Sequence, residues 1–240
     1  MSLPVKSLTA TAALLAVLPL SACGASISGA DVQKEQHTYS VPRVKDLQIV
    51  GRTGSVEVVG ADVTAVSVTE RLRFTKNGRP SVRHQVVDGR LEASYSCPNS
   101  FSLTGHTCEV DYRVTVPRTV AADLRTDTGH IKVTGVNAQI TARTNTGSIT
   151  GTALRPPSSA RISARADTGS IRLTLATAPA GITANANTGQ IRIAVPGKQQ
   201  YAVNVDTNTG SKKVDVPTAP NASHTIKAHT DTGDVSLTAA

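Results

Sequence analysis

Aromatic side chains are scarce in this sequence of 240 residues, which has no Trp, two Phe and four Tyr. A globular core of this size usually contains more rings, because each ring buries a large apolar area. A core of stacked small aliphatic side chains is the alternative. The chain also lacks a Gly-x-Ser-x-Gly elbow, a phosphate-binding glycine loop and a dinucleotide fingerprint. We therefore expect a non-enzymatic protein without a cofactor.

Long apolar runs are lacking except at residues 8–20, and roughly 13 residues are too few to cross a bilayer as a helix. With Lys6 before it, this run is typical of an export signal. It ends in Leu20-Ser21-Ala22-Cys23-Gly24, which resembles a bacterial lipobox. The resemblance implies cleavage after Ala22, a diacylglycerol thioether on Cys23, and a protein anchored by lipid to the extracytoplasmic face of the cell membrane. The alternative is an ordinary signal peptide that leaves Cys23 as a free thiol.

Cysteine is rare as well, with Cys97 and Cys108 left once Cys23 is assigned to the lipid. Outside the cytoplasm, two such residues pair by default, so we predict a Cys97–Cys108 disulfide. Two reduced cysteines that never meet are the alternative.

Acidic residues are few relative to basic ones, and the formal net charge is +8. Residues 121–240 carry 12 Lys and Arg against 7 Asp and Glu, which places most of the excess there. An exported basic surface suits anionic lipids or anionic wall polymers, whereas nucleic acid is excluded as a partner by the lack of aromatic platforms. The alternative is that the arginines are merely solvated strand positions. The candidate binding residues are Arg143, Arg165, Arg172 and Arg192.

One tripeptide, Asp/Asn-Thr-Gly, recurs six times, with successive glycines 18, 22, 20, 21 and 23 residues apart. Apolar and polar residues alternate on both sides of each copy, as they do in β-strands. Two residues after the glycine stands Ile or Val, with Lys212 as the one departure. A degenerate copy stands at Arg52-Thr53-Gly54. The predicted turns are Asp127 and Gly129, Asn145 and Gly147, Asp167 and Gly169, Asn187 and Gly189, Asn208 and Gly210, and Asp231 and Gly233.

The composition of the tripeptide explains its place in a tight turn. Asp and Asn bond to their own following backbone, and Gly adopts a positive φ without a steric penalty. A repeat of about 20 residues with equivalent apolar positions predicts a β-solenoid, whose rungs stack about 4.8 Å apart. The turn position reads Asp, Asn, Asp, Asn, Asn, Asp along the chain, so no two carboxylates are neighbours in this order. That order favours stacked turns, because adjacent carboxylates would repel.

Asp-Thr-Gly is also the signature of aspartic proteases, and Asp167-Thr168-Gly169-Ser170 matches it locally. Those enzymes need two carboxylates that share one proton. Asn takes the same place in three of the six copies, so we interpret the tripeptide as a turn rather than as a hydrolase site.

Metal binding is the other alternative for these turns. Calcium needs six to eight oxygen ligands, and the dense acidic spacing of calcium-binding repeats is lacking. The six histidines show no metal-ligand spacing either. We therefore predict no metal site.

The expected organisation has four parts: a signal peptide over 1–22, the lipidated Cys23 with a polar tether over 23–45, a first rung with an insertion over 46–120, and the repeat solenoid over 121–240. Within the insertion, strands are expected over 65–74, 82–87, 90–96 and 109–116. The turns Asn77-Gly78 and Asp88-Gly89 favour antiparallel hairpins. The predicted fold is therefore an all-β solenoid with inserted antiparallel hairpins and a disulfide.

From about residue 45 to 240 the chain resembles the bacterial putative-adhesin family of unknown function. The resemblance rests on Gly54-Ser55-Val56-Glu57-Val58, on Val114-Thr115-Val116-Pro117, and on the repeated Thr-Gly-x-Ile pattern. It implies a β-solenoid in the cell envelope and brings no catalytic residues.

Two functions follow from these expectations. The first is a membrane-anchored binding or scaffolding module that presents a repetitive basic β face to an anionic polymer, a lipid surface or a protein partner. The second is a structural or envelope-stress-sensing component that assembles through an open last rung near Val235–Leu237, because an uncapped edge invites strand addition.

Overall fold

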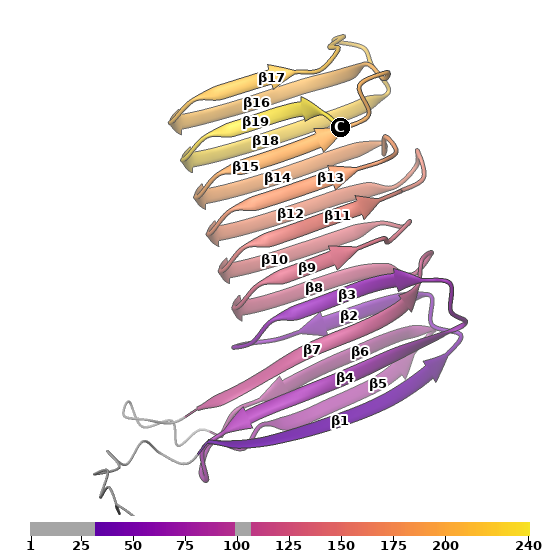
Figure 1. Cartoon of the computed structure of the whole chain (residues 1–240), viewed down its shortest axis with the longest axis vertical. Coiled ribbons are helices and arrows are strands. Elements are labelled where there is room, and N and C mark those ends of the chain that lie inside the picture. The colour runs from indigo at the N-terminus through magenta and orange to yellow at the C-terminus, as the bar shows by residue number, and fades with distance from the viewer. Residues whose placement is uncertain (1–31, 99–106) are drawn as a thin grey trace, which may run out of the picture.

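The computed structural model describes residues 32–98 and 107–240, which form a ten-stranded sheet and a nine-stranded sheet packed face to face (Figure 1). We name them sheet A and sheet B. The export signal and Cys23 lie outside the described residues. Within residues 32–98 and 107–240, no helix is long and apolar enough to cross a membrane.

The strands follow one another across each sheet in an order that departs from the sequence. Sheet A runs β1 (Gln33–Pro42), β4 (Ala65–Phe74), β7 (Cys108–Pro117), β3 (Val56–Ala61), β9 (Ile131–Thr134), β11 (Ile149–Leu154), β13 (Ile171–Leu175), β15 (Ile191–Val195), β19 (Val235–Ala239) and β17 (Lys212–Asp215). Sheet B runs β5 (Ser81–Val87), β6 (Arg90–Ser96), β2 (Asp46–Val50), β8 (Ala121–Thr128), β10 (Ile140–Thr146), β12 (Arg161–Thr168), β14 (Gly181–Thr188), β18 (His224–Thr232) and β16 (Tyr201–Thr209).

Each repeat forms one rung: a strand in sheet B, a tight turn, and a strand in sheet A. Parallel pairing keeps equivalent residues in register, so that Ile140 lies beside Ile162 in sheet B and Ile149 beside Ile171 in sheet A. These side chains point between the sheets and are almost fully buried. Stacked aliphatic ladders thus form the core, and the predicted all-β solenoid is confirmed.

The glycine of each turn lies against the turn of the neighbouring rung. Gly147 has a φ of +142°, and a Cβ there would meet the carbonyl oxygen of Gly129 at 1.9 Å. The buried hydroxyl of Thr144 donates a hydrogen bond to that same oxygen at 3.1 Å. Only glycine allows so close an approach, which explains its place in all six copies.

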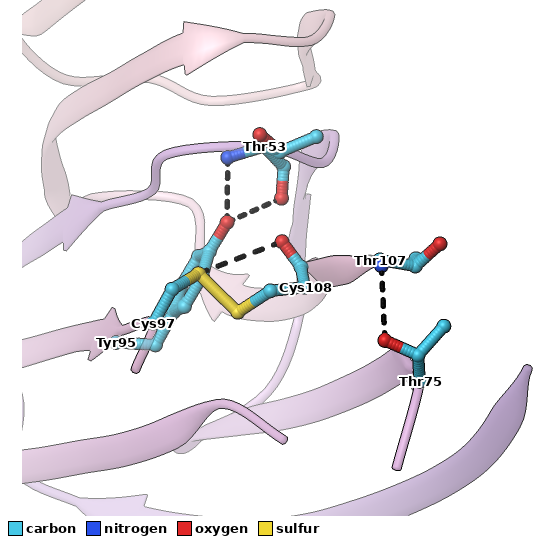
Figure 2. Close-up of a disulfide and its surroundings, with 6 residues drawn as sticks. All are labelled: Thr53, Thr75, Tyr95, Cys97, Thr107 and Cys108. Carbon is cyan, nitrogen blue, oxygen red and sulfur yellow. Dashed lines mark hydrogen bonds between the residues drawn. A yellow bond between two sulfur atoms is a disulfide. The ribbon is translucent and has the colours of Figure 1, made fainter. Parts of the chain in front are cut away.

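The segment inserted after the first rung forms further rungs. Strands β6 and β7 pair in parallel with β2 and β3, whereas β5 and β4 add antiparallel strands outside them. The Cys97–Cys108 disulfide joins the end of β6 to the start of β7, with a Cα–Cα distance of 6.1 Å (Figure 2). Beside it, the Tyr95 hydroxyl contacts the backbone of Thr53, which ties this rung to the first turn. The insertion is therefore a cap that continues the solenoid.

The polar segment after Cys23 was expected to be a tether as far as residue 45, but Gln33–Pro42 form strand β1. This strand pairs antiparallel with β4 along its whole length, from Gln33 beside Phe74 to Pro42 beside Ala65. Tyr39 and Val41 pack against the core. The segment was mistaken for a tether because only these inward positions are apolar, as expected of an edge strand whose other face meets solvent.

The last two rungs lie in the opposite order to the sequence. The rung of β18 and β19 lies between that of β14 and β15 and that of β16 and β17. In Figure 1 the marked C-terminus accordingly lies below the end of the stack. Val235 and Leu237 are 1% exposed, whereas Val214 on β17 is 42% exposed. The expectation of an open edge at Val235–Leu237 was therefore wrong, and the edge rung is β16–β17.

Lys212 explains this order physically. It occupies the inward position that holds Ile or Val in the other repeats, and its ammonium lies 3.8 Å from Asp206. A charged side chain at an inward position is costly between two rungs but tolerated at an edge, where it also discourages strand addition.

Candidate functional site

Three arginines on the outer face of sheet B lie side by side. Arg143 on β10 is the Cα partner of Arg125 on β8 and of Arg165 on β12, so that neighbouring residues are about 4.8 Å apart. We name Arg125, Arg143 and Arg165 the arginine row. All three side chains are exposed.

The arginine row is neutralised unevenly. Arg125 forms a salt bridge of 3.0 Å with Asp123, and Arg165 one of 3.4 Å with Asp167. No carboxylate of the described chain lies within salt-bridge distance of Arg143. The reason is local, because Asn145 stands two residues after Arg143 where Asp167 stands two residues after Arg165.

A shallow depression of about 360 Å³ surrounds Arg143 and extends over the two following rungs. Within the described chain, the side chains of Ser163 and Asn185 in its wall make no hydrogen bond, and both are only partly exposed. We name this depression the Arg143 depression. Besides Thr144, it is lined by Arg143, Asn145, Ser163, Arg165, Asp167 and Asn185.

The outer face of sheet A carries a second basic feature. Arg172 on β13 and Arg192 on β15 are Cα partners, and both are exposed. We name them the arginine pair. As far as the structure describes the chain, neither guanidinium has a carboxylate within salt-bridge distance.

Two other basic residues on the same face share one carboxylate. Lys132 and Arg113 both contact Glu57, at 3.2 and 3.0 Å. The hydrogen bond from Lys132 and the charge of Arg113 lower the pKa of Glu57, so this carboxylate stays ionised. The arginine pair, by contrast, has no carboxylate partner within the described residues.

The four arginines selected from the sequence do not share one surface. Arg143 and Arg165 face outward from sheet B, whereas Arg172 and Arg192 face outward from sheet A. Their distance from the turn decides this, because the first two stand four residues before the glycine and the other two stand three residues after it. Arg125 also stands four residues before a turn glycine, Gly129, and the choice made from the sequence missed it.

The turns bring the Asp and Asn side chains together along one edge of the solenoid. Because the last two rungs are exchanged, the spatial order is Asp127, Asn145, Asp167, Asn187, Asp231 and Asn208, which alternates without exception. The amide of Asn145 donates to Asp127 at 3.4 Å, and that of Asn208 donates to Asp231 at 3.0 Å.

This alternation bears on the two chemical alternatives for the motif. An Asn rung separates each Asp from the next, which places successive carboxylates roughly 9.6 Å apart, too far to share a proton. No cluster of three His, Cys, Asp or Glu side chains suited to a metal ion occurs in residues 32–98 and 107–240.

A buried carboxyl group lies in the cap, away from both basic faces. Glu70 is 1% exposed and accepts a hydrogen bond of 3.1 Å from the Tyr39 hydroxyl. The ring of Tyr39 stacks on His84 with centroids 4.0 Å apart. Burial raises the pKa of Glu70, although the hydrogen bond from Tyr39 opposes this shift.

The family model described as Toastrack DUF4097 matches residues 20–238. The fold is similar to the crystal structure of a "putative cell adhesion protein" from Clostridium sporogenes, with a TM-score of 0.55 and 9% identity over 87% of this chain and 100% of that one. It also matches a "putative adhesin" from Bacteroides fragilis, with a TM-score of 0.46 and 11% identity over 87% of this chain and 97% of that one. No curated protein matches the sequence.

Proposed function

This chain belongs to the Toastrack DUF4097 family, and on that premise we propose that it is a non-enzymatic binding module of the cell envelope. It is anchored to the extracytoplasmic face of the membrane through a lipid on Cys23. Its basic β faces bind an anionic polymer, in preference to a lipid surface or a protein partner.

The observation that carries this proposal is the placement of like charges in direct register. Arginines side by side on neighbouring strands repel each other and destabilise the sheet. Arg172 and Arg192 are such neighbours, and no carboxylate of the described chain relieves them. A bound polyanion would remove the repulsion, so the arrangement favours a binding function over a purely structural one.

Three further features support an envelope role. The lipobox-like Leu20-Ser21-Ala22-Cys23 would anchor the chain outside the cytoplasm. The Cys97–Cys108 disulfide suits an oxidising compartment. The Clostridium sporogenes protein with the same fold carries the name of a putative cell adhesion protein, which agrees with a role in binding.

The test measures co-sedimentation of the full-length protein, purified in mild detergent, with cell-wall and membrane fractions over a salt series. Binding to a polyanion releases counterions and should weaken steeply between about 50 and 200 mM salt. Replacing both Arg172 and Arg192 by Gln should weaken binding and flatten the salt dependence.

The matched control is a double substitution of Lys132 and Arg113 by Gln, which removes the same amount of positive charge from residues that already contact Glu57. It should change binding less than the Arg172/Arg192 variant does. Absence of binding at low salt would contradict the polyanion proposal and point to a protein partner.

A further inference from the structure

We propose that the Arg143 depression binds an acidic polysaccharide, with a sugar carboxylate on the guanidinium of Arg143. This inference rests on the proposed function and narrows the anionic polymer to one chemical class. It concerns sheet B alone, so it is tested separately from the arginine pair on sheet A.

The charge of the depression calls for a ligand with few negative charges. Two guanidinium groups, of Arg143 and Arg165, and one carboxylate, of Asp167, leave a net charge of +1. The salt bridge to Asp167 occupies Arg165, so Arg143 is the open cation. A planar carboxylate fits a guanidinium with two parallel hydrogen bonds.

The other polar groups suit sugar hydroxyls. Ser163 and Asn185 offer a hydroxyl and an amide without partners in the described chain. The amide nitrogen of Asn145 already donates to Asp127, which leaves its carbonyl oxygen to accept. Asp167 also accepts only. A sugar ring supplies the hydroxyl donors that these acceptors need.

A polymer of phosphates satisfies the depression less well. Phosphate oxygens at neutral pH accept hydrogen bonds and do not donate them, so they offer no donor to the remaining acceptor positions of Asp167 and Asn145. The negative charge of Asp167 repels either anion, so the difference lies in the hydroxyl donors, which a sugar has and a bare polyphosphate lacks. The presence of Asp167 therefore distinguishes an acidic sugar from a bare polyanion.

The dimensions agree with a short stretch of polysaccharide. The depression covers three rungs, β10, β12 and β14, which are spaced about 4.8 Å apart. It is shallow, so each site binds weakly and a long chain gains affinity from repeated contacts.

The experiment is calorimetric titration of the full-length protein in detergent with three probes: a galacturonate oligosaccharide, the neutral galactose oligosaccharide of the same length, and inorganic polyphosphate. We expect the galacturonate probe to bind and the neutral probe not to bind. Arg143→Gln should weaken galacturonate binding about tenfold or more, which corresponds to loss of a charge-assisted bidentate pair.

Two further variants make the test specific. Arg83→Gln removes an exposed arginine from the outer face of β5 in the same sheet, far from the depression, and should leave binding unchanged. Asp167→Asn should strengthen polyphosphate binding more than galacturonate binding, because it removes a negative charge that repels both probes and one acceptor oxygen that only the sugar hydroxyls use.

The outcomes separate this inference from the proposed function. The inference would be overturned if Arg143→Gln left galacturonate binding intact. It would also be overturned if Arg143→Gln and Arg83→Gln weakened that binding equally. Preferential binding of polyphosphate over galacturonate would also overturn the inference, but it would agree with the proposed function. Absence of binding to either anion at low salt would contradict both.

Discussion

At the scale of single residues, Gly147 shows how strictly the turns are constrained. We predict that Gly147→Ala destabilises the fold by about 3 kcal/mol or more, because it adds a positive-φ penalty to a collision with the Gly129 carbonyl. Urea denaturation of both proteins measures the difference. Gly51→Ala is the control, since a Cβ there meets ordinary contacts at 3.5 Å. Equal losses in the two variants would contradict the prediction.

Glu70 is the residue whose ionisation should matter most for stability. Its pKa is raised in the fold, so the contribution of its neutral form is complete below pH 4.5 and is lost as the pH rises through the folded pKa. Glu70→Gln is neutral throughout and keeps an oxygen for the Tyr39 hydroxyl. We therefore expect it to be more stable than the wild type at pH 8, with little difference at pH 4.

Thermal unfolding across this pH range provides the measurement. Glu35 and Asp62 have a pKa lowered by Arg79 and Arg118 respectively, so their contribution to stability is lost as the pH falls, equally in both proteins. Subtracting the pH profile of Glu70→Gln from that of the wild type therefore isolates the effect of Glu70 ionisation on stability. A difference that is constant from pH 4 to pH 8 would show that its ionisation has no influence.

At the scale of the element, strand β17 is an edge because its side chains oppose further stacking. We predict that Lys212→Ile, which restores the apolar ladder, increases self-association of the protein with concentration. Sedimentation velocity over a concentration series detects the larger species. Lys213→Ile on the outward face of the same strand is the control and should associate less. If Lys212→Ile behaves like the wild type, Lys212 does not protect the edge.

The strands of the insertion pair in a way that was only partly expected. Its strands were expected as hairpins, and β5 and β6 do form one at Asp88-Gly89. However, β6 and β7 also pair in parallel with the first rung, which sequence alone does not reveal because long-range pairing leaves no local pattern.

At the scale of the whole molecule, the exchange of the last two rungs predicts an unusual response to truncation. Removing residues 216–240 would delete an interior rung and leave β16 and β17 without partners. Removing residues 201–217 would delete only the edge rung, since β18 and β19 pair directly with β14 and β15. We expect the first deletion to lower the melting temperature more than the second. Calorimetry measures the melting temperature of each variant. A larger decrease for the deletion of residues 201–217 would contradict the observed rung order.

The alternation of Asp and Asn at the turns depends on the order of the rungs in the whole molecule. Along the sequence, Asn187 and Asn208 are consecutive copies, and the pattern is broken. In the folded molecule Asp231 lies between them, so every carboxylate has amide neighbours along the stack. Repulsion between stacked carboxylates is thereby avoided, and two of the amides donate hydrogen bonds to their neighbours.

The sequence by itself determined the unit of this protein: two strands, a turn closed by glycine, and inward aliphatic residues at fixed distances from that glycine. These features are local, because they depend on the φ of Gly147 and its equivalents and on alternation within single strands. The basic character of the surface was also evident, since it requires only a count of charges.

Only the tertiary structure decided how the units are combined. It placed β1 in the cap, exchanged the last two rungs, and divided the four selected arginines between two faces. The physical reason is that rungs of equivalent pattern pair almost equally well with one another. Their order then depends on small differences, such as a single charge at Lys212, that act only once the rungs are stacked.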